Sequence, residues 1–274
     1  MRLSKMDQNG GTDVRVSCNW PVIAQYVALM KNRGLAFSTV SGRKMRLEAL
    51  PECIEDCTVN DVLSVIPLYL KASSRLTYLA QLQYACRDML KAGLITRDPT
   101  VGITVVKPAR RLPRPLTPRE QTVLLGMEGR ARAWTVLGQF AGFRASDVVR
   151  VEFDHLEERE YGTVLRVPHG KGGLDATLPA HPMVVQALSR YVGTKGPIWS
   201  LQAATMSKAW AAAAAEVGVK ARFHQNRHTY ATRMYQQTHD IAIVSRLMRH
   251  ASVATTMVYT EIGNEEQFAA VMGL

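Results

Sequence analysis

The sequence predicts a mainly α-helical protein of two domains, the second of which also carries a small antiparallel β-sheet. Three observations lead to this fold class. Apolar residues recur at helical spacing through most of the 274 residues. A basic, proline-rich segment interrupts that pattern near residue 110. Beyond it, two short β-type segments flank a glycine-rich turn. The chain is long enough for each domain to have its own core.

The N-terminal part predicts a small helical domain over residues 17–106. Residues 1–16 are polar and contain glycines, so we expect a disordered start. One helix should end at Gly34, a second should begin at the capping box of Thr58 and Asp61, and a third should cover about residues 75–92. Nothing in the first 100 residues has the alternation of a strand.

Residues 107–116 are predicted to form an extended interdomain linker. Their three prolines exclude a helix and favour extended conformations in the residues before them. The segment is basic and contains no acidic residue, so it can follow a phosphate backbone. The alternative is a solvated linker whose charges only keep it extended. The basic residues that we assign to DNA contact are Lys107, Arg110, Arg111 and Arg114.

The second domain, residues 117–260, should open with a helix, because Thr117 and Glu120 form a capping box around Pro118. Strands are expected at residues 164–167 and 176–178, with a turn at 169–173 between them. Further helices are expected near residues 181–192, 203–217, 227–237 and 240–248, followed by a short C-terminal helix with an apolar face within residues 261–274.

Charge and hydropathy limit the class of function. The net charge of +11 and the isoelectric point near 9.7 favour a polyanionic partner, either nucleic acid or an anionic membrane. No basic amphipathic helix stands out, which argues against a membrane-surface protein. No apolar run approaches the ~20 residues of a membrane span, and the N-terminus lacks the apolar region of a signal peptide. We therefore expect a cytoplasmic protein that acts on nucleic acid.

Two separated segments carry cations that suit a phosphodiester. Arg144 precedes Ser146 and Asp147, so Ser146 can cap the next helix and Asp147 can brace the guanidinium. A planar guanidinium fork binds two phosphate oxygens at once. Lys171 lies between glycines in the predicted turn, where its ammonium is mobile. Taken alone, each residue is more simply interpreted as structural or solvated.

Two later segments add histidines, a further arginine and a phenol. His224 and Arg227 lie three residues apart at the predicted start of a helix, where they share one face and where anions bind. His224 and His228 also have the spacing of metal ligands, but zinc requires a third protein ligand and no convincing one is nearby. His250 follows a helical run, and Tyr259 comes nine positions later. Together the segments could bind one phosphodiester, attack it and protonate the leaving oxygen.

The order and spacing of these segments resemble the tyrosine recombinase, or phage integrase, family. Gly142–Asp147 resembles its first-arginine box, His224–Thr232 its His-x-x-Arg box, and Met248–Thr260 its nucleophile box. Residues 17–106 are similar to its helical core-type DNA-binding domain. One departure is Arg249, because the family usually has glycine before this histidine. Only about sixteen residues precede the first domain, which resembles the simple two-domain recombinases without an arm-binding domain.

The resemblance implies a chemistry for six side chains. The tyrosine attacks DNA to give a 3′-phosphotyrosine and a free 5′-hydroxyl, and the first histidine is its base. The two arginines and the second histidine bind the phosphate, and the lysine protonates the leaving oxygen. No metal or other cofactor is needed, because the covalent intermediate keeps the bond energy. The implied catalytic residues are Arg144, Lys171, His224, Arg227, His250 and Tyr259.

The resemblance also implies a function and partners. It implies a site-specific recombinase that integrates or excises a phage or mobile element in a bacterial host cell, associated with the nucleoid. The alternatives are a relaxing topoisomerase of the tyrosine type and a catalytically silent DNA-binding protein on the same fold, although none of the six residues is missing.

The implied partners are double-stranded attachment sites with inverted half-sites. The chain is expected to be a monomer when free and a homotetramer on two DNA sites. Residues 261–274 would dock as an exchange helix on a neighbouring protomer, or else pack on their own domain. Candidates for contact with DNA in the helical domain are Arg43, Lys44, Arg75, Thr77 and Gln81.

Overall fold

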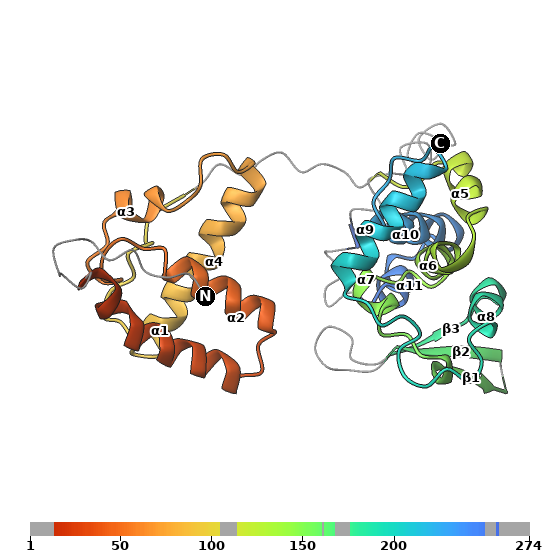
Figure 1. The fold of residues 1–274 in the computed structure, drawn as a ribbon, viewed down its shortest axis with the longest axis horizontal. Coiled ribbons are helices and arrows are strands. Elements are labelled where there is room, and N and C mark those ends of the chain that lie inside the picture. Colours follow the sequence, from red (N-terminus) through yellow and green to blue (C-terminus); the bar gives the residue numbers. More distant parts are fainter. Residues whose placement is uncertain (1–13, 105–113, 161, 168–175, 250–255, 258–274) are drawn as a thin grey trace, which may run out of the picture. The chain divides into compact units, whose positions relative to one another are not determined.

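The computed structural model describes residues 14–104, 114–160, 162–167, 176–249 and 256–257 (Figure 1). The chain separates into two compact units, Met1–Arg110 and Arg111–Leu274. The described part is mainly helical and contains one antiparallel sheet, which confirms the predicted fold class. Within the described ranges, none of the helices combines the length and the apolar character needed to span a membrane.

The first unit is built from helices whose inner faces meet in one core. Its helix α2 packs against both α1 and α4. Residues of α1 and α4 supply much of the buried apolar surface, among them Tyr26, Met30, Leu82 and Met89, which are all fully buried. The helices are α1 (Val14–Asn32), α2 (Phe37–Leu47), α3 (Val59–Ser64) and α4 (Ala72–Lys91).

Local sequence patterns predicted some of these helices but not others. The capping box at the start of α3 is confirmed, since Thr58 Oγ1 accepts from Asp61 N at 3.3 Å and Asp61 Oδ2 accepts from Thr58 N at 2.8 Å. The expectation of disorder through residue 16 is wrong at its end, because α1 begins at Val14. Helix α2 was not predicted, because its sequence is rich in polar and basic residues and its inner face includes Arg43.

Helix α6 is the scaffold of the second unit. Seven consecutive residues, Ala133–Gln139, are buried, so α6 is covered on all sides. It packs against α5, α8, α9 and α10, and a second small core lies between α10 and α11. The helices are α5 (Pro118–Leu125), α6 (Gly129–Phe140), α7 (Ala145–Val148), α8 (Pro182–Ser189), α9 (Ala203–Glu216), α10 (His224–Thr238) and α11 (Ile241–Leu247).

A three-stranded antiparallel sheet lies beside this helical core, after the 3₁₀ turn η1 (Phe153–His155). Leu165 of the central strand pairs with Leu156 on one side and Leu178 on the other, so one face of the sheet is apolar. The first strand was not predicted, because three of its four residues are charged. The strands, in sheet order, are β1 (Leu156–Arg159), β2 (Gly162–Val167) and β3 (Ala176–Pro179).

Candidate active site

A tight turn after α6 places Arg144 at the start of α7. Gly142 has a left-handed φ of 63°, and a Cβ added there would lie 2.6 Å from Cδ1 of Tyr230. Only glycine fits both the backbone conformation and this close approach. Phe143 turns inward and is 1% exposed, whereas Arg144 is half-buried and occupies the N-cap of α7.

Asp147 fixes the backbone of this turn. Its Oδ2 accepts a hydrogen bond from Arg144 N at 2.9 Å, and the residue is 5% exposed. The same oxygen accepts from Arg249 Nη2 at 2.9 Å, while Oδ1 accepts from Arg150 Nη2 at 3.3 Å. The sequence suggested that Asp147 would brace the guanidinium of Arg144 and that Ser146 would cap the helix. In the described contacts, Asp147 holds the backbone amide of Arg144, and Arg144 itself is the N-cap.

Helix α10 carries the second group of site residues and begins earlier than predicted. It starts at His224 rather than near residue 227, although its N-cap, Phe223, offers no side-chain hydrogen bond. Instead, Gln225 reaches back from the first turn, and its Oε1 accepts from Arg222 N at 2.8 Å. A helix that starts without a capping side chain gives no signal to mark its first residue.

Arg227 links the two segments that flank the site. The residue is 1% exposed, and its guanidinium donates to the carbonyl oxygens of Gly142 and Met248. Gly142 belongs to the turn that precedes Arg144, and Met248 follows α11. These charge-assisted bonds lie in a buried environment, where they are strong. Arg227 therefore holds the turn of Arg144 at a fixed place relative to the end of α11.

His224 lies one turn from Arg227 on an exposed part of α10. Desolvation, followed by the positive charges of Arg227 and Arg144, lowers the pKa of His224 below its usual value. The ring is therefore neutral at neutral pH and able to accept a proton. A bound phosphate would offset the charges of the two guanidiniums and so reverse part of this shift in the pKa of His224.

His228 packs against His224 from the next turn of the helix. The two ring planes meet at 84°, and their centroids are 4.5 Å apart. Burial, with the charges of His224 and Arg227, lowers the pKa of His228 to about 4. Within the described ranges, no group of three or more metal-ligating side chains gathers around this pair or elsewhere.

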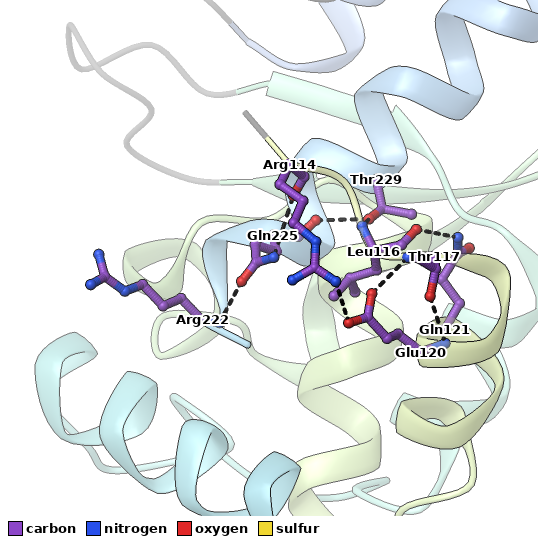
Figure 2. Close-up of polar contacts among 8 residues, drawn as sticks. All are labelled: Arg114, Leu116, Thr117, Glu120, Gln121, Arg222, Gln225 and Thr229. Atoms are coloured by element: carbon purple, nitrogen blue, oxygen red, sulfur yellow. Dashed lines mark hydrogen bonds and ion pairs between the residues drawn. The ribbon is translucent and has the colours of Figure 1, made fainter. Parts of the chain in front are cut away.

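The segment that leads into the second unit is attached to the first turns of α10 (Figure 2). Leu116 N donates to Thr229 Oγ1 at 2.8 Å, and Gln225 Nε2 donates to the carbonyl of Arg114 at 3.3 Å. The predicted capping box of α5 is confirmed, since Glu120 N donates to Thr117 Oγ1 at 3.2 Å and Thr117 N donates to Glu120 Oε2 at 2.8 Å. These bonds hold α10 on both sides of Arg227.

The structure brings together three of the six residues that the resemblance implies. Arg144 and Arg227 lie close enough to His224 for their charges to lower its pKa. The other three, Lys171, His250 and Tyr259, lie outside the described residues, as do Lys107, Arg110, Arg111 and the C-terminal residues 261–274. Thr256, three positions before Tyr259, is fully buried.

The candidate DNA contacts of the first unit lie on two packed helices. Lys44 is on α2, while Arg75, Thr77 and Gln81 are on α4. Arg43 is in a different environment, because it is 9% exposed, donates to Tyr26 Oη at 3.0 Å and stacks on the ring of Tyr84 at 4.1 Å. The assignment of Arg43 to DNA contact conflicts with this placement, since its guanidinium is engaged within the core.

Several residues that shape the site were not recognised in the sequence. Tyr230 packs on Gly142, and Gln139 donates to Asn226 Oδ1 at 3.0 Å between α6 and α10. Thr229 and Gln225 hold the segment that leads into α5. Their partners are about 90 to 110 residues away in sequence, so no local spacing could reveal them. Asp147, in contrast, was recognised in the sequence, because it lies only three residues after Arg144.

Comparison with known proteins supports the interpretation of this arrangement. A family model described as the phage integrase family matches residues 127–266. The chain is 26% identical to the tyrosine recombinase XerD of Lacticaseibacillus casei in an alignment 284 positions long that covers 90% of this chain and 96% of the relative. It is 29% identical to the tyrosine recombinase XerC of Azotobacter vinelandii over 198 residues, a match that spans 64% of this chain and 65% of the relative's length.

Solved structures share the fold. The XerH site-specific recombinase bound to a palindromic difH substrate has a TM-score of 0.68 at 17% identity, and the match covers 91% of this chain and 84% of that one. A lambda integrase dimer (residues 75–356) bound to a COC′ core site has a TM-score of 0.67 at 19% identity, with 86% and 96% covered.

Proposed function

The chain belongs to the phage integrase family, and from that premise we propose that it is a site-specific DNA recombinase that acts through a 3′-phosphotyrosine. The observation that carries the proposal is the position of Arg227, which ties the turn of Arg144 to the end of α11, two residues before His250. His224, kept neutral by desolvation and by the charges of Arg227 and Arg144, lies on the same helix. This arrangement suits an attack on one phosphodiester.

The proposed reaction begins with the phenol of Tyr259. A phenol has a pKa of ~10, so it needs a base and positive surroundings to act as a nucleophile near neutral pH. The Tyr259 oxygen attacks phosphorus and its proton passes to His224, while Lys171 protonates the 5′-oxygen as the bond to phosphorus breaks. A 5′-hydroxyl from the partner strand then reverses these steps and releases Tyr259.

In this proposal the phosphate is bound by two arginines that differ in their exposure to solvent. Arg144 is half-buried at a helix start, where its guanidinium can contact the non-bridging oxygens directly. Arg227 is almost fully buried, so in this proposal it supplies charge from beneath the phosphate and fixes the position of Arg144. His250 adds a hydrogen bond to the phosphate. Binding of the phosphate offsets the two guanidinium charges and raises the pKa of His224, which strengthens it as a base.

The proposal extends to the DNA and to assembly. We propose contacts with double-stranded sites by Lys44, Arg75, Thr77 and Gln81 of the first unit and by the basic linker, with Arg43 acting as a core residue. Two inverted half-sites would bind two protomers, and a tetramer would join two sites through residues 261–274. One solved relative is described as a lambda integrase tetramer bound to a Holliday junction. A role in integration or excision of a phage or mobile element fits this assembly.

The proposal can be tested without knowing the target sequence. A pool of duplexes with a randomised segment and a nick is mixed with the protein, and complexes that resist denaturing detergent are recovered and sequenced. We expect one enriched sequence with inverted half-sites. A plasmid that carries two copies of this sequence should then lose or invert the intervening DNA.

The outcomes separate the proposed function from its alternatives. Deletion or inversion at the enriched sequence, absent with Tyr259→Phe, supports a recombinase. Relaxation of supercoiled plasmid without exchange would indicate a topoisomerase. Specific binding with no detergent-resistant complex would indicate a DNA-binding protein without catalysis. The last two results would contradict the proposal.

A further inference from the structure

Arg249 has a backbone conformation that disfavours its own side chain. It directly follows the C-cap of α11 with a left-handed φ of 53°. In the described part of the chain, only His239 and Arg249 are non-glycine residues with a positive φ. Glycine adopts this conformation at little cost, whereas a residue with a Cβ is strained there. An arginine at this position therefore needs compensating contacts.

The side chain of Arg249 makes such contacts with Phe143, directly before Arg144, and with Asp147, three residues after it. Its Nη2 lies 2.9 Å from Asp147 Oδ2, and the two side chains are 9% and 4% exposed. Its guanidinium also stacks on the ring of Phe143, 5.1 Å from the centroid. Phe143 precedes Arg144 in the turn, and Asp147 accepts the hydrogen bond of the Arg144 amide. Arg249 thus contacts the turn both before Arg144, at Phe143, and after it, at Asp147.

We propose that Arg249 is a positioning residue that fixes the segment leading to His250 and Tyr259 against the turn of Arg144. The inference rests on the proposed function, because it assigns Arg249 a role in the same reaction. Two guanidiniums hold consecutive residues, since Arg227 donates to the carbonyl of Met248 while Arg249 reaches Asp147 through its own side chain. The two links act on adjacent residues, Met248 and Arg249, and together limit the movement of these residues relative to the turn of Arg144.

Burial explains how the single ion pair between Arg249 and Asp147 can fix the end of α11 against the turn of Arg144. A pair shielded from solvent holds a more defined geometry than an exposed one, because water and salt screen it less. Asp147 has a second cationic neighbour, Arg150, at 3.3 Å, but the side chain of Arg150 is 44% exposed and lies just after α7, in the same part of the chain as Asp147. Arg150 therefore cannot connect Asp147 to the end of α11. Of these two arginines, only Arg249 spans the 102 residues between the two segments.

The substitution Arg249→Gly separates positioning from simple stabilisation. Glycine relieves the backbone strain but removes the link to Asp147. If Arg249 serves only the end of the helix, this variant should be as stable and as active as the native chain. If Arg249 positions the nucleophile segment, formation of the covalent complex should slow by ~10–100-fold even where the variant is fully folded.

The measurement is the single-turnover rate of detergent-resistant complex formation at saturating protein. The probe is the duplex enriched from the randomised pool, and folding is checked by circular dichroism at the assay temperature. DNA affinity should be unchanged, because the Arg249 guanidinium is buried against Asp147 and Phe143. Amide hydrogen exchange, measured without DNA, should become faster in residues 141–150 and remain unchanged in α5.

Further variants keep the test decisive if Arg249→Gly folds poorly. Arg249→Lys keeps the charge without the planar fork and should restore part of the rate, whereas Arg249→Gln should not. The matched control is Arg150→Gln, which removes the exposed arginine from the same carboxylate and should react at the native rate. Native rates for folded Arg249→Gly and Arg249→Gln would overturn the inference. Absence of a covalent complex with the native chain would instead overturn the proposed function.

Discussion

The two units each contain a buried arginine, and they hold it in different ways. In the helical unit, Arg43 contacts other side chains, with a hydrogen bond to Tyr26 Oη at 3.0 Å and the ring of Tyr84 at 4.1 Å. In the second unit, Arg227 donates to two backbone carbonyls, those of Gly142 and Met248. Side-chain partners can shift with the arginine, whereas backbone partners fix the chain itself. The first arrangement builds a core, and the second also fixes the turn of Arg144 relative to the end of α11.

Replacement of each arginine by methionine should show the largest difference between the units. Arg227→Met removes the charged donor from two carbonyls, those of Gly142 and Met248, so the second unit should lose about 3–5 kcal/mol of stability and all covalent complex formation. Arg43→Met removes the hydrogen bond to Tyr26 Oη, a weak one to Met30 Sδ at 3.9 Å and one cation–π interaction, so the first unit should lose about 1–2 kcal/mol. Native-state hydrogen exchange in the intact chain measures each unit separately. Equal losses in the two units would remove the distinction.

One glycine in each unit allows the backbone constraints of the two units to be compared. Gly142 and Gly34 have similar φ angles of 63° and 69°, but only Gly142 has a neighbour within 4 Å of an added Cβ. Gly142→Ala should therefore cost about 2–4 kcal/mol, from backbone strain and from the collision with Tyr230. Gly34→Ala meets only the strain and should cost about 1 kcal/mol. If both variants lose the same stability, the contact with Tyr230 is unimportant.

Dependence of stability on pH should distinguish the units through His228. All seven histidines lie beyond residue 110, so the first unit has none. The pKa of His228 falls from 6.5 to about 4 on folding, so the unfolded chain binds its proton more readily between these values. Its contribution is complete above pH 6.5 and is lost as the pH falls towards 4, by about 2 kcal/mol after allowance for partial exposure.

The check is hydrogen exchange in each unit at pH 7 and pH 4.5. The native second unit should lose stability that His228→Gln retains, while the acid response of the first unit should be the same in both proteins. An identical acid response of the second unit in the native chain and in His228→Gln would contradict the assignment.

The smallest effect concerns the linker between the units. Replacement of Arg110, Arg111 and Arg114 by glutamine should weaken DNA binding on all sequences alike. Removal of one arginine–phosphate ion pair should reduce the log–log salt slope by ~0.9. Arg114 should contribute least, since it lies 2.6 Å from Glu120 in an ion pair. Arg190→Gln, at an exposed position after α8, is the control. An unchanged slope in the triple variant would show that these arginines are only solvated.

Sequence reasoning succeeded where the physical cause is local. The capping boxes of Thr58 and Thr117 and the two strands β2 and β3 depend on residues a few positions apart, and the structure confirms them. It failed where partners are distant or where local signals conflict. Helix α2 has a buried arginine on its inner face, and charged residues dominate β1, so tertiary packing decides both elements.

The candidate site shows the same division. The spacing of His224 and Arg227 is local, so their proximity at the start of a helix was predicted, although α10 begins at His224 rather than near residue 227. The hydrogen bonds from Arg227 to the carbonyls of Gly142 and Met248 span 85 and 21 residues, and no local sequence pattern around Gly142 or Met248 predicts them. Arg249 stands out in the sequence as a departure from the family, but only the structure shows its ion pair with Asp147.

The central claim is that Tyr259 becomes joined to DNA in a site organised by Arg144, His224 and Arg227. The most direct test is to digest the detergent-resistant complex with nuclease and trypsin and to locate the attached nucleotide by mass spectrometry. Trypsin cuts after Arg249, and residues 250–274 contain no other cleavage site and a single tyrosine. We predict a 3′-nucleotide on this peptide, at Tyr259. A nucleotide on any other residue, or a recombination product formed by the Tyr259→Phe variant, would contradict the account.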